Sequence, residues 1–273
     1  MKKLILSVAM LSLGSMAMSQ GMYASFNVGY GFATPGDAIG TKEVTDASGN
    51  QTSTNIYGSL GAGLNLGLTP GYMFNEHVGF ELGLNYLLGS ETTTLDDTTP
   101  LSSDVRKSKS NQFRVIPTIV VSSGGDGLQV YGKAGLVLPV AGSTKSTVDI
   151  TAPGNVTAMN ITSKGAFTMG YTGALGVAYG LNEKLSLFGE VSHTNLRITS
   201  KTQTIESSTT NGSDNLAGAP AYFKETKFVD ELNSSSNNTS YNSNTNLNAA
   251  KEELASKTNF NALFINLGVK FNF

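Results

Sequence analysis

Hydrophobic and polar residues alternate along much of this chain with a period of two, which is typical of β-strands with two unlike faces. The C-terminal segment 262–273 shows this most clearly, because every second residue is hydrophobic: Leu263, Ile265, Leu267, Val269, Phe271 and Phe273. Seven more segments follow the same alternation, at 23–32, 58–74, 78–90, 111–122, 128–141, 165–181 and 185–199. The pattern therefore predicts eight β-strands.

The connections between the predicted strands alternate in length. Short turns lie at 75–77, 123–127 and 182–184, and long polar connections lie at 33–57, 92–110, 142–164 and 200–257. A soluble β-sandwich has no reason to sort its loops, because both of its ends meet water. A bacterial outer-membrane barrel has short periplasmic turns and long extracellular loops. The sorting favours such a barrel, with both termini on the periplasmic side.

The first residues have the features of a secretory signal peptide. Lys2 and Lys3 precede an apolar stretch at 4–13, and small residues follow it, so that cleavage is expected before Gln20 or after Ala17. The alternative is a membrane anchor, but a spanning helix needs about 20 apolar residues, roughly twice this run. We therefore predict a signal peptide at 1–19 and one barrel domain at 20–273.

Composition excludes several classes of protein. The chain has no cysteine, which excludes a disulfide scaffold, a thiolate zinc site and a cysteine nucleophile. Charged residues make up 14% of the chain, well under the ~25% of soluble proteins. The formal charge of −2 comes without a basic cluster, so we expect no nucleic-acid partner. No phosphate loop, metal cluster or suitably spaced carboxylate pair occurs, and we expect no catalytic residue, metal or cofactor.

In a membrane the hydrophobic face of a sheet points outward, and the sheet must close because lipid cannot pair with backbone groups. Eight strands enclose an interior that side chains just fill. By alternation five charged residues point into this lumen: Glu81, Arg114, Lys133, Glu190 and Lys270. We interpret them as a network of paired charges that plugs the lumen, since buried charges persist only when paired. The alternative is that they line a narrow path for ions or solutes.

Three finer expectations follow from the strand pattern. Lys133 and Glu190 each lie about six residues from a short turn, so we hypothesise that they pair. Pro117 falls in the middle of a strand, where it removes a ladder hydrogen bond, and we predict a bulge there. Aromatic residues at the strand ends are candidates for two girdles at the membrane interfaces: Tyr72, Phe74, Phe80, Tyr179, Phe271 and Phe273 at the turn end, and Phe32, Tyr86, Phe113 and Phe167 at the loop end.

The signal peptide, the eight alternating strands, the sorted loops and the terminal Phe273 together resemble the small OmpA/OmpX-like outer-membrane β-barrel proteins. The resemblance covers residues 22–273 and rests on pattern rather than on a catalytic motif. It implies an all-β, eight-stranded antiparallel up-and-down barrel in the lipid of the bacterial outer membrane. Residues Val269, Phe271 and Phe273 look like the family's C-terminal assembly signal, which implies the barrel-assembly machinery as a partner during biogenesis.

The two histidines are candidate catalytic residues, because some eight-stranded barrels are enzymes that modify lipids. His77 is interpreted as a solvated turn residue, whereas His193 faces lipid by alternation. A lipid A deacylase barrel has a serine two residues from such a histidine, with an acid nearby. Here that position is Asn195 and Glu190 points inward, so we do not expect an enzyme.

The last long connection, 200–257, is rich in Ser, Thr and Asn, and we expect little order in it. Two parts differ: 221–232 is partly apolar, and 248–257 predicts a short helix. We interpret this loop as a solvated cap over the barrel, with docking of an unknown extracellular ligand as the alternative. The expected function is a structural or interaction barrel that displays its loops; the alternative is a narrow porin-like channel.

Overall fold

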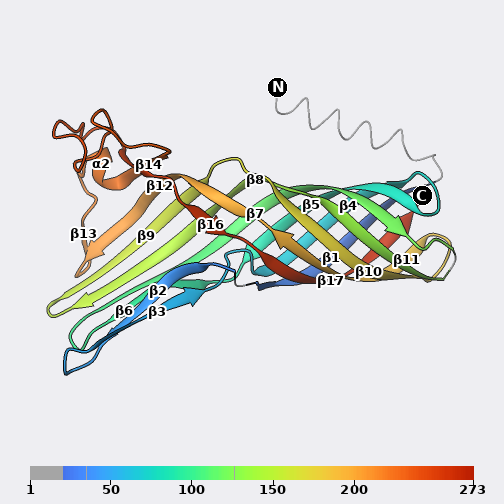
Figure 1. Ribbon diagram of the computed structural model, residues 1–273, viewed down its shortest axis with the longest axis horizontal. Helices are drawn as coiled ribbons and strands as arrows, with labels where there is room; N and C mark the ends of the chain where they lie inside the picture. Colours follow the sequence, from blue (N-terminus) through green and yellow to red (C-terminus); the bar gives the residue numbers. More distant parts are fainter. Residues whose placement is uncertain (1–20, 35, 126) are drawn as a thin grey trace.

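The computed structural model describes residues 21–34, 36–125 and 127–273. Eight of its strands form a closed antiparallel barrel, which lies on the right in Figure 1. The barrel strands are β1 (Met22–Ala33), β4 (Gly63–Met73), β5 (Val78–Gly89), β7 (Ser103–Ser122), β8 (Leu128–Ala152), β10 (Gly170–Gly180), β11 (Leu185–Asn195) and β17 (Ala262–Asn272). Each pairs with the next along this series, and β17 pairs with β1 to close the barrel. The predicted fold is confirmed. The predicted signal peptide, 1–19, lies outside the described residues.

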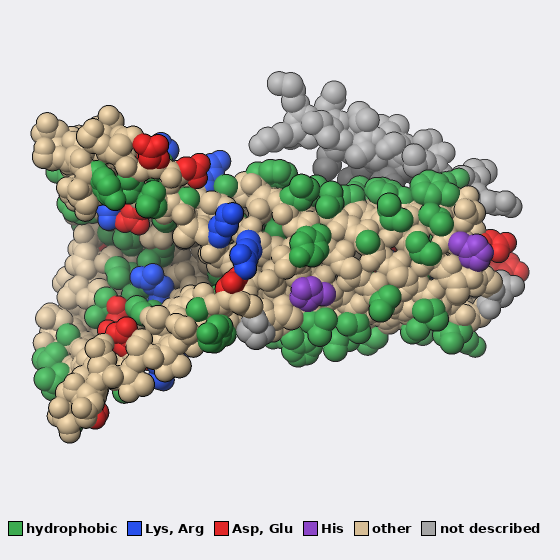
Figure 2. Space-filling view, viewed as in Figure 1, with side chains coloured by type: hydrophobic (Ala, Val, Ile, Leu, Met, Phe, Trp, Pro, Cys, Tyr) green, Lys and Arg blue, Asp and Glu red, His purple; other side chains and the backbone are tan. Residues whose placement is uncertain are grey.

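The hydrophobic face of the barrel points outward. On β17, Ile265 is 50% exposed and Leu267 is 67% exposed, whereas Asn266 between them is 4% exposed. Figure 2 shows hydrophobic side chains spread over the outer wall, with acidic and basic side chains at its ends and on the extension beyond. All ten aromatic residues expected at the strand ends are exposed. An apolar surface of this extent suits lipid, since soluble monomers rarely expose patches above a few hundred Å².

The sheet continues beyond the loop end of the barrel as an extension (Figure 1). β7 and β8 run from the barrel into it, and the other strands are β2 (Ala38–Thr45), β3 (Gln51–Tyr57), β6 (Thr92–Thr98), β9 (Asn155–Gly165), β12 (Arg197–Thr210), β13 (Ser213–Asp214), β14 (Glu225–Val229), β15 (Lys251–Leu254) and β16 (Lys257–Asn259). Much of the length predicted as polar loop is therefore strand. β-Branched residues, threonine above all, favour paired strands even where both faces are polar.

The segment 200–257 is more ordered than its composition predicts. The Asn237 side chain shows how: its amide donates to the carbonyl oxygens of Asn246, Ala249 and Ala250 at 3.0, 3.2 and 2.9 Å. Such side-chain bonds stand in for backbone partners in irregular chain. The disorder expected from composition is thus wrong for this segment.

The helix predicted at 248–257 is also wrong. Residues Lys251–Leu254 form β15, which pairs in parallel with β14, and the short helix α2 lies at Ala221–Lys224 instead. Pairing with a distant strand overrides the local helical pattern, which is a tertiary effect. Among the described residues, no helix is long and apolar enough to cross a membrane.

β7 passes Pro117 without a bulge, so the predicted bulge is wrong. Pro117 pairs opposite Leu82 in an unbroken register with β5. On the β8 side the ladder skips Ile116 and Pro117, and it resumes at Thr118 without a shift. The missing N–H therefore removes pairing locally but requires no extra residue. The register shift between β7 and β8 falls instead between Phe113 and Arg114.

Candidate functional site

Three of the five inward charges form one network inside the barrel. Lys133 on β8 places its Nζ 2.9 Å from Glu81 Oε2 on β5 and 2.9 Å from Glu190 Oε2 on β11. Two tyrosine hydroxyls complete it: Tyr23 donates to Glu81 Oε1 at 2.7 Å, and Tyr131 donates to Glu190 Oε2 at 3.2 Å. One ammonium thus serves two carboxylates, each of which also has a phenol donor. We name this group the lumen network.

Arg114 and Lys270 also point inward, but they stand apart from the lumen network. Arg114 on β7 is 2% exposed, and its Nε donates to Gln112 Oε1 at 2.9 Å. Lys270 on β17 places its Nζ 5.1 Å from the centre of the Tyr23 ring. Neither forms an ion pair with a carboxylate of the described chain. The predicted pair of Lys133 and Glu190 is confirmed, whereas a network of all five inward charges is not.

Glycines make room for the aromatic rings of the lumen. A Cβ added at Gly71 would overlap the ring of Tyr23, and one added at Gly176 would overlap the ring of Tyr131. These are the two tyrosines that hold the carboxylates of the lumen network. Gly71 and Gly176 are therefore required by the packing of these two tyrosine rings.

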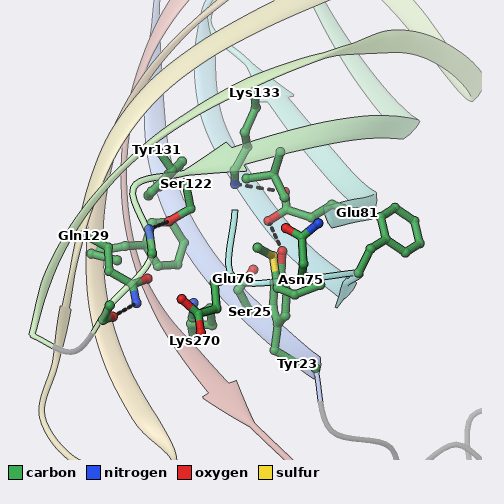
Figure 3. Close-up of a pocket in the computed structure, with 18 residues that line it drawn as sticks. Tyr23, Ser25, Asn75, Glu76, Glu81, Ser122, Gln129, Tyr131, Lys133 and Lys270 are labelled. Atoms are coloured by element: carbon green, nitrogen blue, oxygen red, sulfur yellow. Dashed lines mark hydrogen bonds and ion pairs between the residues drawn. The ribbon is translucent and has the colours of Figure 1, made fainter. Parts of the chain in front are cut away.

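A cavity of about 610 Å³ leads from the turn end of the barrel to the lumen network. Figure 3 shows Lys133, Glu81 and Tyr23 on its walls, with Lys270 and Glu76 nearby. We name this space the vestibule. A second cavity of about 70 Å³ adjoins the network and is lined by Arg114 and by several Asn, Ser and Thr side chains. The free space in the lumen is therefore much smaller beside Arg114 than between the turn end and Lys133.

Buried apolar side chains gather in two clusters at the loop end of the barrel. One cluster consists of Leu60, Val137, Leu196 and Phe260, all at most 4% exposed. Another consists of Leu87, Ala262 and Phe264, also at most 4% exposed. We name these two clusters together the apolar plug. It occupies the part of the lumen where the strands pass into the extension.

The apolar plug depends on the irregular segments next to the strands. Leu60 precedes β4, Leu196 lies between β11 and β12, and Phe260 lies between β16 and β17. Backbone bonds join them: Phe260 N–H donates to the Leu196 carbonyl at 2.8 Å, and Leu60 N–H donates to the Asn259 carbonyl at 3.0 Å. Leu196 N–H in turn donates to Asn261 Oδ1 at 2.8 Å.

Sequence reasoning missed this plug. The alternation of segment 58–74, extended back to its first residues, predicts that Leu60 faces lipid. This is wrong because the regular strand β4 begins only at Gly63. A signal was present, since Leu87 and Val137 are large apolar residues at inward positions.

The two histidines lie outside the lumen. His193 is on the outer wall, with its Nε2 3.3 Å from Thr34 Oγ1. His77 lies in the turn after β4, where its Nδ1 is 3.1 Å from the Ser122 carbonyl oxygen. Within the described ranges, no three His, Asp or Glu side chains are arranged to hold a metal ion.

The residues that resemble an assembly signal lie on the outer face at the turn end of β17. Val269, Phe271 and Phe273 are 40%, 43% and 58% exposed, and the rings of Phe271 and Phe273 meet edge to face with centres 5.3 Å apart.

Comparison with known proteins places this barrel in a family. The model of the outer membrane protein beta-barrel domain matches residues 4–219. Among solved structures, Neisserial surface protein A is 12% identical over 93% of this chain and 97% of its own, with a TM-score of 0.39. OprG from Pseudomonas aeruginosa is 14% identical over 93% and 97%, with a TM-score of 0.43. No curated protein matches the sequence. The family match covers most of a closed barrel with a hydrophobic outer wall, and the chain therefore belongs to the β-barrel proteins of the bacterial outer membrane.

Proposed function

We propose that this protein is a largely plugged barrel that anchors and displays an extracellular strand extension. The apolar plug carries the proposal, because Val137 and Leu196 are at most 1% exposed in the part of the lumen that a solute would have to cross. A path for ions needs polar groups or water along its whole length, and a packed apolar constriction opposes both.

The extension supports a display role. β8 has 25 residues, whereas a strand crosses the membrane in about 9–11. More than half of β8 is thus available outside the membrane, and β9 and β12 pair beside it. Exposed surface held by a rigid scaffold is where binding residues commonly lie. An extracellular ligand would dock on this extension, and no enzymatic activity is expected.

Biogenesis forms part of the proposal. We propose that residues 1–19 are removed on export and that the barrel-assembly machinery reads Val269, Phe271 and Phe273. The outward alternation and edge-to-face ring contact of these residues support a surface that another protein can reach before the barrel closes.

Planar-bilayer recording of the pure refolded protein tests the plugged lumen. We expect no steady, reproducible conductance steps from the natural sequence. Truncating the plug in a Leu196→Ala/Phe260→Ala double variant should produce openings, because it removes two side chains from the closed end. A matched Val191→Ala/Leu263→Ala variant shortens outward residues and should stay silent. Steady steps from the natural protein would refute the proposal.

The second candidate function is a narrow channel for ions or small solutes, and the vestibule favours it. This cavity has a volume of about 610 Å³ and extends from the turn end as far as Lys133, so a solute could enter that part of the lumen. If the protein conducts, Lys133→Met and Glu190→Gln should alter the conductance, because both charges would line the path. Conductance that neither variant changes would show that ions pass elsewhere.

A further inference from the structure

The hydrogen-bonded ladder of the barrel wall is interrupted beside β8. This strand pairs with β10 up to Val137, and its pairing with β9 begins only at Thr144. Among the described strands, the residues between these points, 138–143, have ladder partners in β7 alone. Ala166, which follows β9, lies against β12 instead, where its N–H donates to the Thr199 carbonyl oxygen at 2.8 Å. One edge of β8 is therefore open at this place.

A cavity of about 240 Å³ lies at the open edge. Its lining includes Gln112, which is 4% exposed, and Phe260 of the apolar plug, which is 3% exposed. It also includes Val140 and Phe167, which are 53% and 77% exposed on the outside. Because buried and outward residues line the same space, the cavity extends into the wall rather than along its surface. We name it the slot.

The slot lies at the level of the aromatic residues of the loop end. Phe167 lines it, and so does Ala141, which pairs with Phe113 across the β7–β8 ladder. Such aromatic girdles mark the boundary between hydrocarbon and headgroups. An unpaired backbone edge is costly in hydrocarbon, whereas the oxygen atoms of a lipid headgroup can accept from its N–H groups. The position therefore suits a molecule with both an apolar and a polar part.

The apolar part of the slot is large enough for a section of acyl chain. An engineered apolar cavity of about 150 Å³ already holds benzene. Val140, Phe167 and Ile198 supply apolar walls. The slot is also continuous with the hydrophobic outer wall of the barrel through the exposed side chains of Val140 and Phe167.

The charge around the slot is positive. Lys164 is the one charged side chain among the described residues that line it, and it is exposed and forms no ion pair within those ranges. The next cavity along β8 and β9 is lined by three lysines and two glutamates: Lys107, Lys109, Lys145, Glu91 and Glu206. Four lysines thus face two glutamates (4 − 2), which leaves two positive charges in excess. This excess favours an anionic headgroup.

We propose that the slot binds a phosphorylated lipid from the leaflet at the loop end of the barrel. One acyl chain lies against Val140 and Phe167, and the phosphate lies near Lys164. The headgroup and glycerol oxygens then meet the open edge of β8, which satisfies backbone groups that no neighbouring strand pairs.

Tryptophan fluorescence in brominated lipid tests the proposal. The chain has no tryptophan, so Phe167→Trp places a single reporter at the slot. The variant is refolded into vesicles of brominated phosphatidylcholine, whose bromine atoms quench a tryptophan that they touch. The vesicles also contain unbrominated phosphatidic acid or, at the same mole fraction, unbrominated phosphatidylcholine. Phosphatidic acid should restore the fluorescence as a lipid that binds about fivefold more strongly, since one lysine near an anionic lipid contributes about that factor.

Three variants locate this preference. In the Phe167→Trp background, Lys164→Gln should abolish the preference for phosphatidic acid, because it removes the charge that lines the slot. Lys184→Gln removes the same charge from the turn between β10 and β11, at the opposite end of the barrel, and should retain the preference. A separate reporter, Leu175→Trp, replaces a 73% exposed residue of the outer wall on β10 and should recover equally with both lipids.

Three results would overturn the proposal. Equal recovery with both lipids at Phe167→Trp would mean that the slot does not select the headgroup. The same preference at Leu175→Trp would mean that the whole protein attracts anionic lipid. A preference that survives Lys164→Gln would mean that the phosphate does not lie at this lysine.

Discussion

Replacing Lys133 by methionine tests the physical role of the lumen network. The change keeps a long, flexible side chain and removes the charge. Glu81 and Glu190 then lose the ammonium that lies 2.9 Å from each, while their side chains stay only 7% and 12% exposed. Removing one partner of a buried ion pair costs about 3–5 kcal/mol, because the other charge stays buried. Here two carboxylates lose their counter-charge, but each keeps the hydrogen bond from a tyrosine hydroxyl. We therefore expect the free energy of unfolding to fall by about 3–5 kcal/mol.

The assay is equilibrium unfolding in urea with the protein in micelles at pH 7, where the free energy of unfolding is compared between variants. The matched control is the triple variant Lys133→Met/Glu81→Gln/Glu190→Gln, which removes all three charges at similar volume. It should recover most of the lost stability, because neutral amides still accept from Tyr23 and Tyr131.

Two outcomes would refute this reasoning. One is a decrease of less than about 1 kcal/mol in the free energy of unfolding of Lys133→Met. So small a decrease is typical of exposed salt bridges, and it would mean that water in the vestibule solvates the two ion pairs of Lys133. A triple variant as unstable as the single one would show that the loss comes from packing of the lysine stem, and not from unpaired charge.

Two further predictions concern packing and pH. Gly176→Ala should lower the free energy of unfolding by about 1–3 kcal/mol, because its Cβ overlaps the Tyr131 ring; Gly173→Ala on the same strand, whose Cβ meets one atom at 3.8 Å, should be nearly neutral in the same assay. In the extension, the hydrogen bond from Lys227 lowers the pKa of Glu252, with help from a backbone N–H. A lowered carboxyl pKa stabilises the fold at neutral pH, and the effect is lost as pH falls through that pKa. The protection of the β14 and β15 amides against hydrogen exchange, taken relative to the intrinsic exchange rate at each pH, should therefore fall on acidification in the natural protein and change less in Glu252→Gln, and equal pH dependence of this protection would contradict the prediction.

The alternation of residues by itself determined the main features of the barrel. Because successive strand residues point to opposite faces, the sequence assigned Ile265 and Leu267 to one surface and Asn266 to the other. Since lipid leaves no backbone group unpaired, an apolar face on all eight strands requires closure with that face outward. The inward positions of Glu81, Lys133 and Glu190 followed from the same rule, before any contact between them was known.

The distance from the short turns predicted the pair of Lys133 and Glu190, which the structure confirms, but only the tertiary structure added Glu81 to this pair and left Arg114 apart. Alternation tells which face of the sheet a residue lies on, but not its position along the barrel axis. That position depends on the stagger of all eight strands together. This is why Lys133 joins two carboxylates while Arg114, also inward, joins none.

The alternation of residues also could not predict the apolar plug or the extension. Leu60 and Phe260 enter the lumen from irregular chain, where no periodicity indicates direction. The polar connections become strands because they find distant partners, as β15 does beside β14, and strand propensity depends on such neighbours. The local pattern of residues determined the strands of the barrel wall. Contacts between distant parts of the chain decided the apolar plug inside the barrel and the extension beyond it.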